Sequence, residues 1–249
     1  MNTADYLLER ADERRPAILT QKGSHSFGQL KAACARLAGE FTAAGVLPGQ
    51  RIGILGENSL FWVASYLAAL KVNAVAVPLP TVATAEDLAR RQQLVRCSAV
   101  CLDRRHRIKL DGALGEDVRR ITEKVLETPG PARWDAPETG SGLDQDAALM
   151  LTSGTTAQPR AVRITHRNIQ ANTDSIVQYL ALDNSDRILV VLPFFYCFGT
   201  SLLHTHLRAG GSLALCNTFV FPETALQMLE RRQCTGIAGV PSTYQTLLR

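Results

Sequence analysis

The chain has 249 residues, of which 46% are hydrophobic and 20% are charged, a composition typical of a globular protein with a sizeable buried core. Its 27 basic and 23 acidic residues give a net charge of only +4, and the arginines are scattered rather than gathered in one tract. This charge pattern gives no indication of nucleic-acid binding. Six cysteines lie in apolar surroundings without a C-x-x-C pair or a signal peptide, which predicts reduced, buried thiols in a cytoplasmic protein.

The first half alternates helix-like and strand-like runs. After an amphipathic helix in the first 15 residues, the pattern predicts strands over 51–55, 74–79 and 98–103, and helices over 60–70 and 84–96. Strands that are apolar on both faces and separated by helices are typical of a parallel sheet covered on both sides. The first half is therefore expected to be doubly wound.

The stretch from Leu60 to Leu79 is long and apolar enough to suggest a membrane span. Lys71 and Asn73 interrupt it, and its pattern changes from helix-like to strand-like. We therefore expect a buried helix followed by a buried strand, and no membrane span.

The second half follows a segment rich in Pro, Gly and acidic residues, which predicts an exposed connector over 128–147. Beyond it, the pattern predicts strands over 147–153, 161–166, 187–193, 212–216 and 236–241, with helices over 167–180, 201–208, 222–232 and from 242 onward. We expect two α/β subdomains, residues 1–127 and 148–249, with stacked, largely parallel sheets.

One loop of the second half carries a candidate site. The stretch LMLTSGTTAQPRAVRITH, Leu149 to His166, places hydroxyl side chains around a glycine and an arginine shortly after them. Phosphate groups are bound by converging hydroxyl and backbone N–H donors with a cation nearby. The loop lacks the Walker spacing, and GILGEN lacks the dinucleotide spacing. From these residues alone, the loop can be interpreted either as a plain hairpin turn or as a phosphate-binding loop. The candidate donors are Thr152, Ser153, Gly154, Thr155, Thr156 and Arg160.

LTSGTTAQPRAVRITHRN resembles the phosphate-loop signature of the adenylate-forming enzymes, roughly T-S-G-[ST]-T-G-x-P-K-G-V with a later H-x-N. This superfamily contains acyl-CoA synthetases, nonribosomal-peptide adenylation domains and luciferases. Three further stretches resemble its N-terminal region, so that the resemblance covers nearly all of Ser26 to Arg249. They are SFGQLKAACARLAGEFTAAGVLPGQRIGILGENSLFWVASYLAALKVNAVAVPLP, VVLPFFYCFGTSLLHTHLRAGGSLAL and GVPSTYQTLL.

The resemblance implies a ligase that uses ATP and Mg²⁺ to convert a carboxylate into an acyl adenylate and transfers the acyl group to coenzyme A or an acyl carrier protein. By similarity, Thr152 to Thr156 hold the β- and γ-phosphates, Thr156 also contacts the magnesium ion, and Arg160 replaces the motif lysine. The acyl pocket is expected along Phe194, Phe195, Tyr196 and the helix after Gly199, with Tyr196 where many members carry histidine. Part of this aromatic group is also expected in the ordinary core.

The loop departs from the family pattern. Ala157 and Ala161 replace glycines, and Arg160 replaces lysine. A left-handed conformation at either alanine would cost about 1–2 kcal/mol. These changes leave open an alternative function, a non-adenylating relative that binds an acyl group or a preformed acyl adenylate. His166, the trailing histidine, is expected to orient the loop or to act as a base. A nicotinamide-dependent oxidoreductase is disfavoured because its glycine fingerprint is missing.

Later family segments, including Y-G-x-T-E, T-G-D and the lysine of a small C-terminal domain, do not occur in these residues. We therefore expect an N-terminal portion that is inactive by itself, with a naturally short protein as the other interpretation. Fatty, aromatic and polyketide-like acids all fit the sequence as substrates, and it does not set the oligomeric state.

Overall fold

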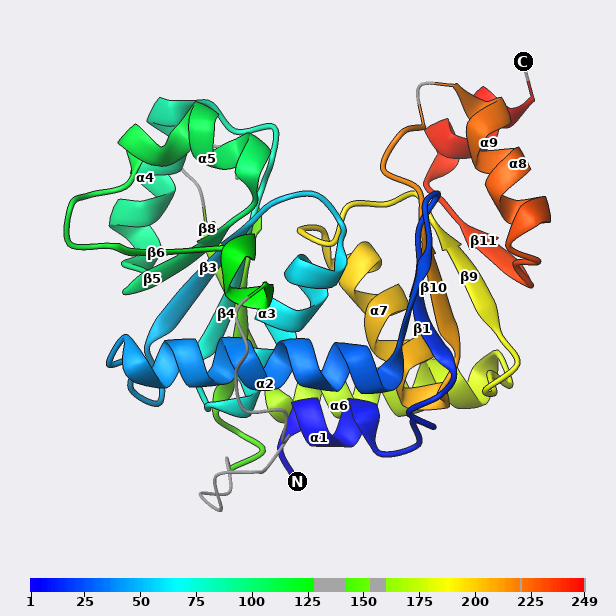
Figure 1. The fold of residues 1–249 in the computed structure, drawn as a ribbon, viewed down its shortest axis with the longest axis horizontal. Helices are drawn as coiled ribbons and strands as arrows, with labels where there is room; N and C mark the ends of the chain where they lie inside the picture. Colours follow the sequence, from blue (N-terminus) through cyan, green and yellow to red (C-terminus); the bar gives the residue numbers. More distant parts are fainter. Residues whose placement is uncertain (128–141, 153–159, 220, 249) are drawn as a thin grey trace. The chain divides into compact units, whose positions relative to one another are not determined.

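The computed structural model describes residues 1–127, 142–152, 160–219 and 221–248 (Figure 1). The helices are α1 (Thr3–Leu8), α2 (Phe27–Ala43), α3 (Leu60–Lys71), α4 (Ala85–Val95), α5 (Arg104–Leu110), α6 (His166–Tyr179), α7 (Cys197–Ala209), α8 (Pro222–Arg231) and α9 (Pro241–Leu247). The strands are β1 (Pro16–Leu19), β2 (Ser24–Ser26), β3 (Arg51–Leu55), β4 (Val75–Leu79), β5 (Ala99–Leu102), β6 (Arg119–Thr122), β7 (Asp146–Thr152), β8 (Arg160–Thr165), β9 (Arg187–Val190), β10 (Ser212–Leu215) and β11 (Gly236–Ala238).

The chain forms two compact units, and each unit contains residues from both ends of the sequence. Unit 1 consists of Met1–Tyr6 and Lys31–Gln170, and unit 2 consists of Leu7–Leu30 and Ala171–Arg249. Each unit has one sheet at its centre.

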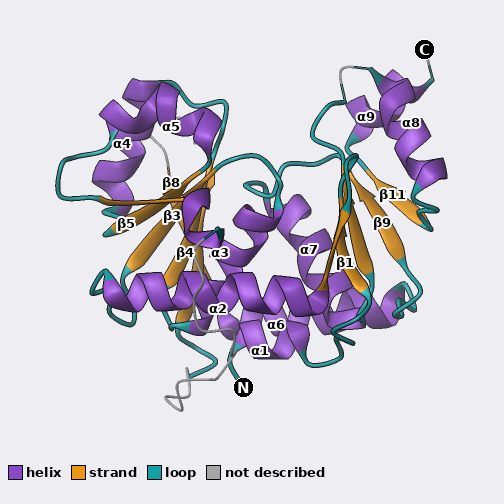
Figure 2. Cartoon of the chain, in the orientation of Figure 1, coloured by secondary structure: helices purple, strands orange, loops and turns teal. Residues whose placement is uncertain are grey.

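Unit 1 contains a six-stranded sheet in the order β6-β5-β3-β4-β7-β8, parallel except for β8, which is antiparallel to β7. Every residue of β4 and β5 is buried, as expected for strands covered on both faces. Helix α3 lies on one side of this sheet and α4 and α5 on the other (Figure 2). The hydroxyl of Ser59 caps α3 by accepting from the backbone N–H of Trp62, which fixes where that helix begins.

Unit 2 contains a five-stranded sheet in the order β11-β9-β10-β1-β2. Strands β1, β10, β9 and β11 are parallel, and β2 adds an antiparallel edge. Helix α7 packs against β9 and β10, whereas α8 covers the opposite face. On that face Ala225 and Met228 of α8 pack with Leu189 and Ala214.

The expected fold class is confirmed, because both units are built on largely parallel sheets with helices on both faces. The helix and strand expected in the apolar stretch are also present, as α3 and β4. Among the described residues, no helix is long and apolar enough to cross a membrane.

The division into units differs from the expected subdomains 1–127 and 148–249. Strand β7 pairs with β4 in the sheet of unit 1, although it follows the segment 128–147 that was expected to separate the subdomains. Strand β1 pairs with β10 of unit 2, with Ile18 opposite Leu213. In each sheet, hydrogen-bonded neighbouring strands therefore come from both halves of the chain. The expected connector falls largely on 128–141, outside the described residues.

The N-terminal helix is shorter than expected. Helix α1 ends at Leu8, and Pro16 already belongs to β1. Two cysteines also depart from the expected burial, since Cys197 is exposed and Cys234 is only partly buried.

Candidate functional site

The hairpin formed by β7 and β8 brings two predicted site residues together. Thr152, the last residue of β7, lies opposite Arg160, the first residue of β8, and both side chains are exposed. Because β7 runs parallel to β4, Thr152 lies at the carboxyl edge of the sheet, where ligands of open α/β sheets usually bind. The remaining predicted donors Ser153, Gly154, Thr155 and Thr156, together with Ala157, lie outside the described residues.

Two solvent-exposed arginines form ion pairs at the base of the hairpin. Arg163 donates to both carboxylate oxygens of Asp146, with Nε 3.0 and 2.9 Å from them. Arg167 donates to both oxygens of Asp144, and this guanidinium lowers the pKa of that carboxyl. Since side chains alternate along a strand, Arg160 and Arg163 point to opposite faces of β8. Arg160 therefore lies on the face of β8 opposite to the one on which Arg163 pairs with Asp146.

Ala161 lies in an ordinary strand conformation. It lies in β8 opposite Leu151 and is not among the described non-glycine residues with positive φ. Its methyl group packs against the buried cluster that includes Leu55 and Leu79. The cost of a left-handed alanine therefore does not arise at Ala161, because the chain is a strand there.

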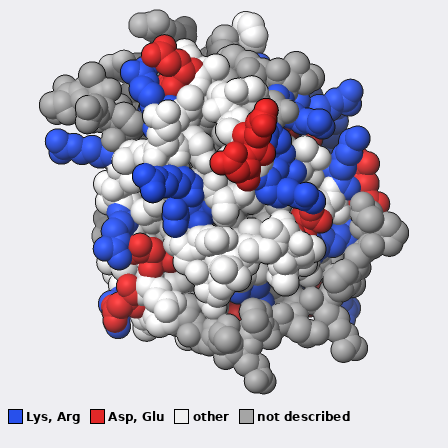
Figure 3. Space-filling view, turned by 90° about the vertical axis from the view of Figure 1, so that its left-hand side faces the viewer, with Lys and Arg blue, Asp and Glu red and all other residues white. Residues whose placement is uncertain are grey.

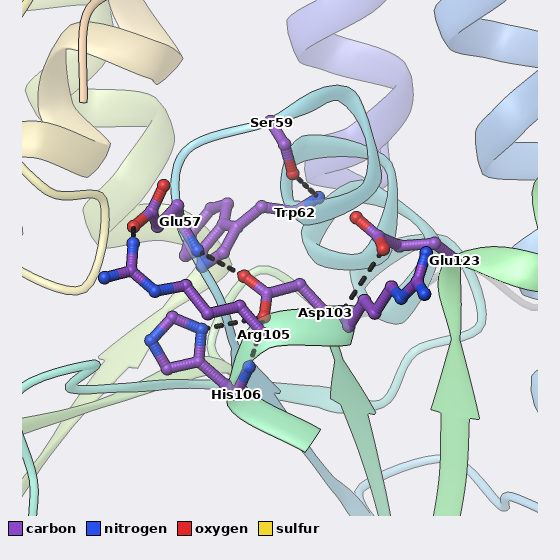
Figure 4. Close-up of polar contacts among 8 residues, drawn as sticks. Glu57, Ser59, Trp62, Asp103, Arg105, His106 and Glu123 are labelled. Carbon is purple, nitrogen blue, oxygen red and sulfur yellow. Dashed lines mark hydrogen bonds and ion pairs between the residues drawn. The ribbon is translucent and has the colours of Figure 1, made fainter. Parts of the chain in front are cut away.

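The loops after β3 and β5 meet at the same carboxyl edge. The connection from β3 leads to β4 on one side, and that from β5 leads to β6 on the other, which makes the space between them a topological switch point. Figure 4 shows the carboxylate of Asp103 there, between the backbone of Glu57 and the ring of His106. Asp103 accepts from the backbone N–H of Glu57 at 2.9 Å and of His106 at 2.8 Å, and His106 Nδ1 lies 2.7 Å from it.

Asp103 was not among the site residues predicted from the sequence. An available signal was an Asp directly after an apolar strand and three residues before His106, which is the spacing of a helix N-cap. Gly56 allows the close approach, because a Cβ atom there would lie 2.8 Å from an oxygen of Asp103. Asp103 thus holds two loops of the edge together.

The face of the molecule in Figure 3 carries charges of both signs side by side. Arg105 pairs with Glu57 at 2.5 Å, and Arg90 pairs with Glu86 at 3.6 Å. Exposed pairs of this kind contribute little to stability.

In unit 2, the loop after β9 carries the predicted acyl-pocket residues. Phe194 and Phe195 are buried, whereas Tyr196 is 55% exposed. The rings of Phe195 and Tyr196 are tilted, with their centroids 4.3 Å apart. This loop also lies at a switch point, since the connection from β9 leads to β10 and β11 lies on the other side. The structure thus divides the aromatic group into core residues and one accessible ring.

Gly199 lets the first turn of α7 pack closely against this loop. A Cβ atom at Gly199 would lie 2.3 Å from the carbonyl oxygen of Pro193. No real side chain tolerates that distance, so the position requires glycine for space rather than for backbone conformation.

His166 is buried and close to the N-terminus of the chain. It is 1% exposed, and its Nδ1 lies 2.8 Å from the hydroxyl of Thr3. Burial lowers its pKa from 6.5 to about 4. A general base must reach its substrate, so this position supports an orienting role rather than the role of a base.

A model of the family of AMP-binding enzymes matches residues 8–249 of the chain. The chain belongs to this family. The resemblance drawn from the sequence is thereby confirmed, over nearly the whole of the described structure.

Relatives of this AMP-binding chain include CoA ligases. Feruloyl-CoA synthase of an Amycolatopsis species is 29% identical over 224 residues, which cover 89% of this chain and 45% of that protein. The 4-coumarate–CoA ligase 5 of Oryza sativa subsp. japonica is 28% identical over 253 residues, 95% of this chain and 47% of that protein. The chain spans about half the length of these curated relatives.

The fold is similar to that of ATP-bound MatB from Rhodopseudomonas palustris. The TM-score is 0.89 at 24% identity, over 100% of this chain and 51% of that one. This likeness supports the fold of both units.

Ala161→Gly is expected to destabilise the protein by about 0.5–1 kcal/mol, because glycine lowers strand stability and loses a packed methyl group. Chemical denaturation measures this change. A stabilised variant would show that a glycine is preferred there after all.

Gly199→Ala is expected to lower stability by about 1–3 kcal/mol, since the methyl group forces backbone atoms apart. Gly39→Ala in α2 is the matched control. Nothing lies within 4 Å of a Cβ atom at Gly39, so this change should be neutral or slightly stabilising. Equal melting temperatures for the two variants would contradict the close packing of Gly199.

Acidification is expected to destabilise the fold through buried neutral histidines. The unfolded chain takes up a proton at His166 below about pH 6.5, whereas the folded chain does so only near pH 4. The stabilisation is therefore complete above pH 6.5 and is lost as the pH falls, by roughly 1–2 kcal/mol between pH 7 and pH 5. His166→Asn should flatten the dependence of unfolding free energy on pH, and an unchanged slope would contradict this assignment.

Proposed function

We propose that this chain forms the part of an ATP-dependent acyl-CoA ligase that binds the polyphosphate of ATP and the acyl group. The reaction joins a carboxylate to AMP with release of pyrophosphate, and then transfers the acyl group to the thiol of coenzyme A or of an acyl carrier protein. We base this on the placement of Thr152 opposite Arg160 at the carboxyl edge of a sheet, in a chain of the AMP-binding enzyme family.

The exposed end of the hairpin has the chemistry that a polyphosphate requires. The guanidinium of Arg160 supplies a permanent positive charge and several N–H donors. The hydroxyl of Thr152 supplies a further donor on the paired strand. A fixed cation beside the phosphates offsets the charge that develops when the carboxylate oxygen attacks the α-phosphorus and pyrophosphate leaves.

Magnesium would add charge neutralisation on the phosphate oxygens. We propose Thr156 as the residue beside the ion, on the strength of the motif, and it lies outside the described residues. The chain's own contribution among the described residues is to orient the phosphates through Thr152 and Arg160.

We propose that the acyl group binds beside Tyr196. Its accessible ring forms an apolar surface at the switch point of unit 2, and the buried ring of Phe195 packs against it with the centroids 4.3 Å apart. Flat, ring-bearing carboxylates stack well on such a surface, and two relatives are named for feruloyl and coumarate groups. Ring-bearing acids are therefore the first class to test, with fatty acids as the comparison. The free cysteines suit a reducing compartment, and we propose the cytoplasm.

Hydroxylamine trapping of the full-length protein tests the reaction. With ATP, Mg²⁺ and a ring-bearing acid, we expect an acyl hydroxamate to form. Product from a synthetic acyl adenylate alone, and none from ATP, would instead identify a non-adenylating relative.

Arg160→Ala is expected to raise the KM for ATP about 10-fold or more, the size typical of a lost charge-assisted hydrogen bond. Arg160→Lys should restore most of the affinity because it restores the charge. Arg163→Ala, on the opposite face of the same strand, is the matched control and should change the KM little. Equal effects of the two alanine variants would refute the role of Arg160.

A further inference from the structure

The first six residues of the chain lie against the carboxyl-terminal end of α3. Nδ2 of Asn2 donates to the carbonyl oxygen of Leu70 at 2.7 Å and to Oδ1 of Asn73 at 2.9 Å. The ammonium group of Lys71, whose side chain is 3% exposed, pairs with Asp5 at 2.5 Å. These contacts attach the N-terminal segment, Met1–Tyr6, to a helix that packs on the central strands of unit 1.

The same segment contacts the first turns of α6. Oγ1 of Thr3 lies 2.8 Å from Nδ1 of His166. Nε2 of Gln170 donates to Thr3 Oγ1 at 3.1 Å and to the carbonyl oxygen of Met1 at 3.2 Å. The hydroxyl of Tyr6 donates to the carbonyl oxygen of Gln170 at 3.3 Å. The N-terminal segment therefore bridges α3 and α6 within unit 1.

The contact between Thr3 and His166 is buried. Thr3 is 0% exposed and His166 is 1% exposed. Because Gln170 donates to the oxygen of Thr3, the hydroxyl proton is available to donate to Nδ1 of a neutral imidazole. Removal of the hydroxyl would leave two buried polar groups without this partner, which is costly in the interior.

His166 is the residue that joins β8 to α6. Its backbone N–H donates to the carbonyl oxygen of Gln145 at 3.1 Å, directly before β7, and so closes the base of the hairpin. Strand β8 pairs only with β7 in the described sheet. The contacts at the end of β8 therefore constrain an edge strand that pairing fixes on one side only.

We propose that Thr3 and His166 are positioning residues for the candidate phosphate site. Their contact anchors the β7–β8 hairpin to α3 through the N-terminal segment, and it thereby fixes how Thr152 and Arg160 present their donors. The identification of the ligand as a nucleotide polyphosphate rests on the proposed function. The anchoring itself does not depend on it.

Hydrogen exchange on the full-length protein tests the anchoring. Thr3→Val removes the hydroxyl at nearly constant shape, and Thr3→Ser keeps it. His166→Leu removes the acceptor, and His166→Asn keeps an acceptor near the position of Nδ1. We expect amides of β7 and β8 to exchange at least about fivefold faster in the Val and Leu variants, the size of one lost buried hydrogen bond. The Ser and Asn variants should resemble the wild type.

Amides of β11, an edge strand of the unit 2 sheet, can exchange through local openings that leave the contact between Thr3 and His166 intact, and they should exchange at the wild-type rate in all four variants. If Thr3→Val does not fold, Thr3→Ala replaces it. Unchanged exchange in the hairpin, or equal acceleration in all strands, would overturn the anchoring whether or not the enzyme is active.

The KM for ATP tests the functional part. We expect the Val and Leu variants to raise the KM at least about fivefold while kcat stays within about twofold, and the Ser and Asn variants to restore it. Faster hairpin exchange with an unchanged KM would overturn the link to the phosphate site. A wild-type protein that consumes no ATP would instead refute the proposed function, and the exchange result would still decide the role of Thr3 and His166.

Discussion

Parallel pairing between β4 and β7 is the constraint on which the candidate site of unit 1 depends. A parallel neighbour must run in the same direction, so the end of β7 lies at the edge where β3, β4 and β5 also end. Thr152 reaches this edge for that reason alone, and Arg160 follows because β8 returns in register beside it. The position of the site thus follows from main-chain hydrogen bonding between strands, whereas its ligand preference follows from the side chains at that position.

In both units, loops that follow the carboxyl ends of parallel strands carry the polar or accessible side chains of interest. In unit 1 the loops after β3 and β5 are joined through Asp103, and in unit 2 the loop after β9 presents Tyr196. Both positions are topological switch points. In unit 2 the rule for open α/β sheets and the family motif indicate the same loop after β9. In unit 1 the switch point lies between β3 and β5, whereas the motif residues Thr152 and Arg160 lie on β7 and β8.

The fold class could be predicted from the sequence because buried parallel strands are apolar on both faces. The runs that became β3, β4, β9 and β10 show this directly. Strands β2 and β6 were not predicted because they lack an apolar run: no residue of β2 is buried, and only Ile121 of β6 is. The division into units could not be predicted either, because the pairing of β1 with β10 depends on contacts between distant residues.

For the site, the sequence indicated residue types but not their surroundings. Arg160 and Tyr196 were expected to be accessible ligands, and both are exposed. Phe194 and Ala161 turned out to be packing residues, since burial depends on neighbouring strands that no local pattern reveals. The environment of His166 was hidden for the same reason, because its partner Thr3 lies 163 positions away in the sequence.

The pairing of β1 with β10 also has a consequence for biosynthesis. Ile18 faces Leu213, so β1, which leaves the ribosome early, must wait until residue 213 has been made before its parallel neighbour β10 exists. Contacts between residues so far apart in the sequence slow folding, and the apolar strand β1 stays exposed until its partner has been made. The nascent chain therefore has a window in which β1 is a natural target for chaperones.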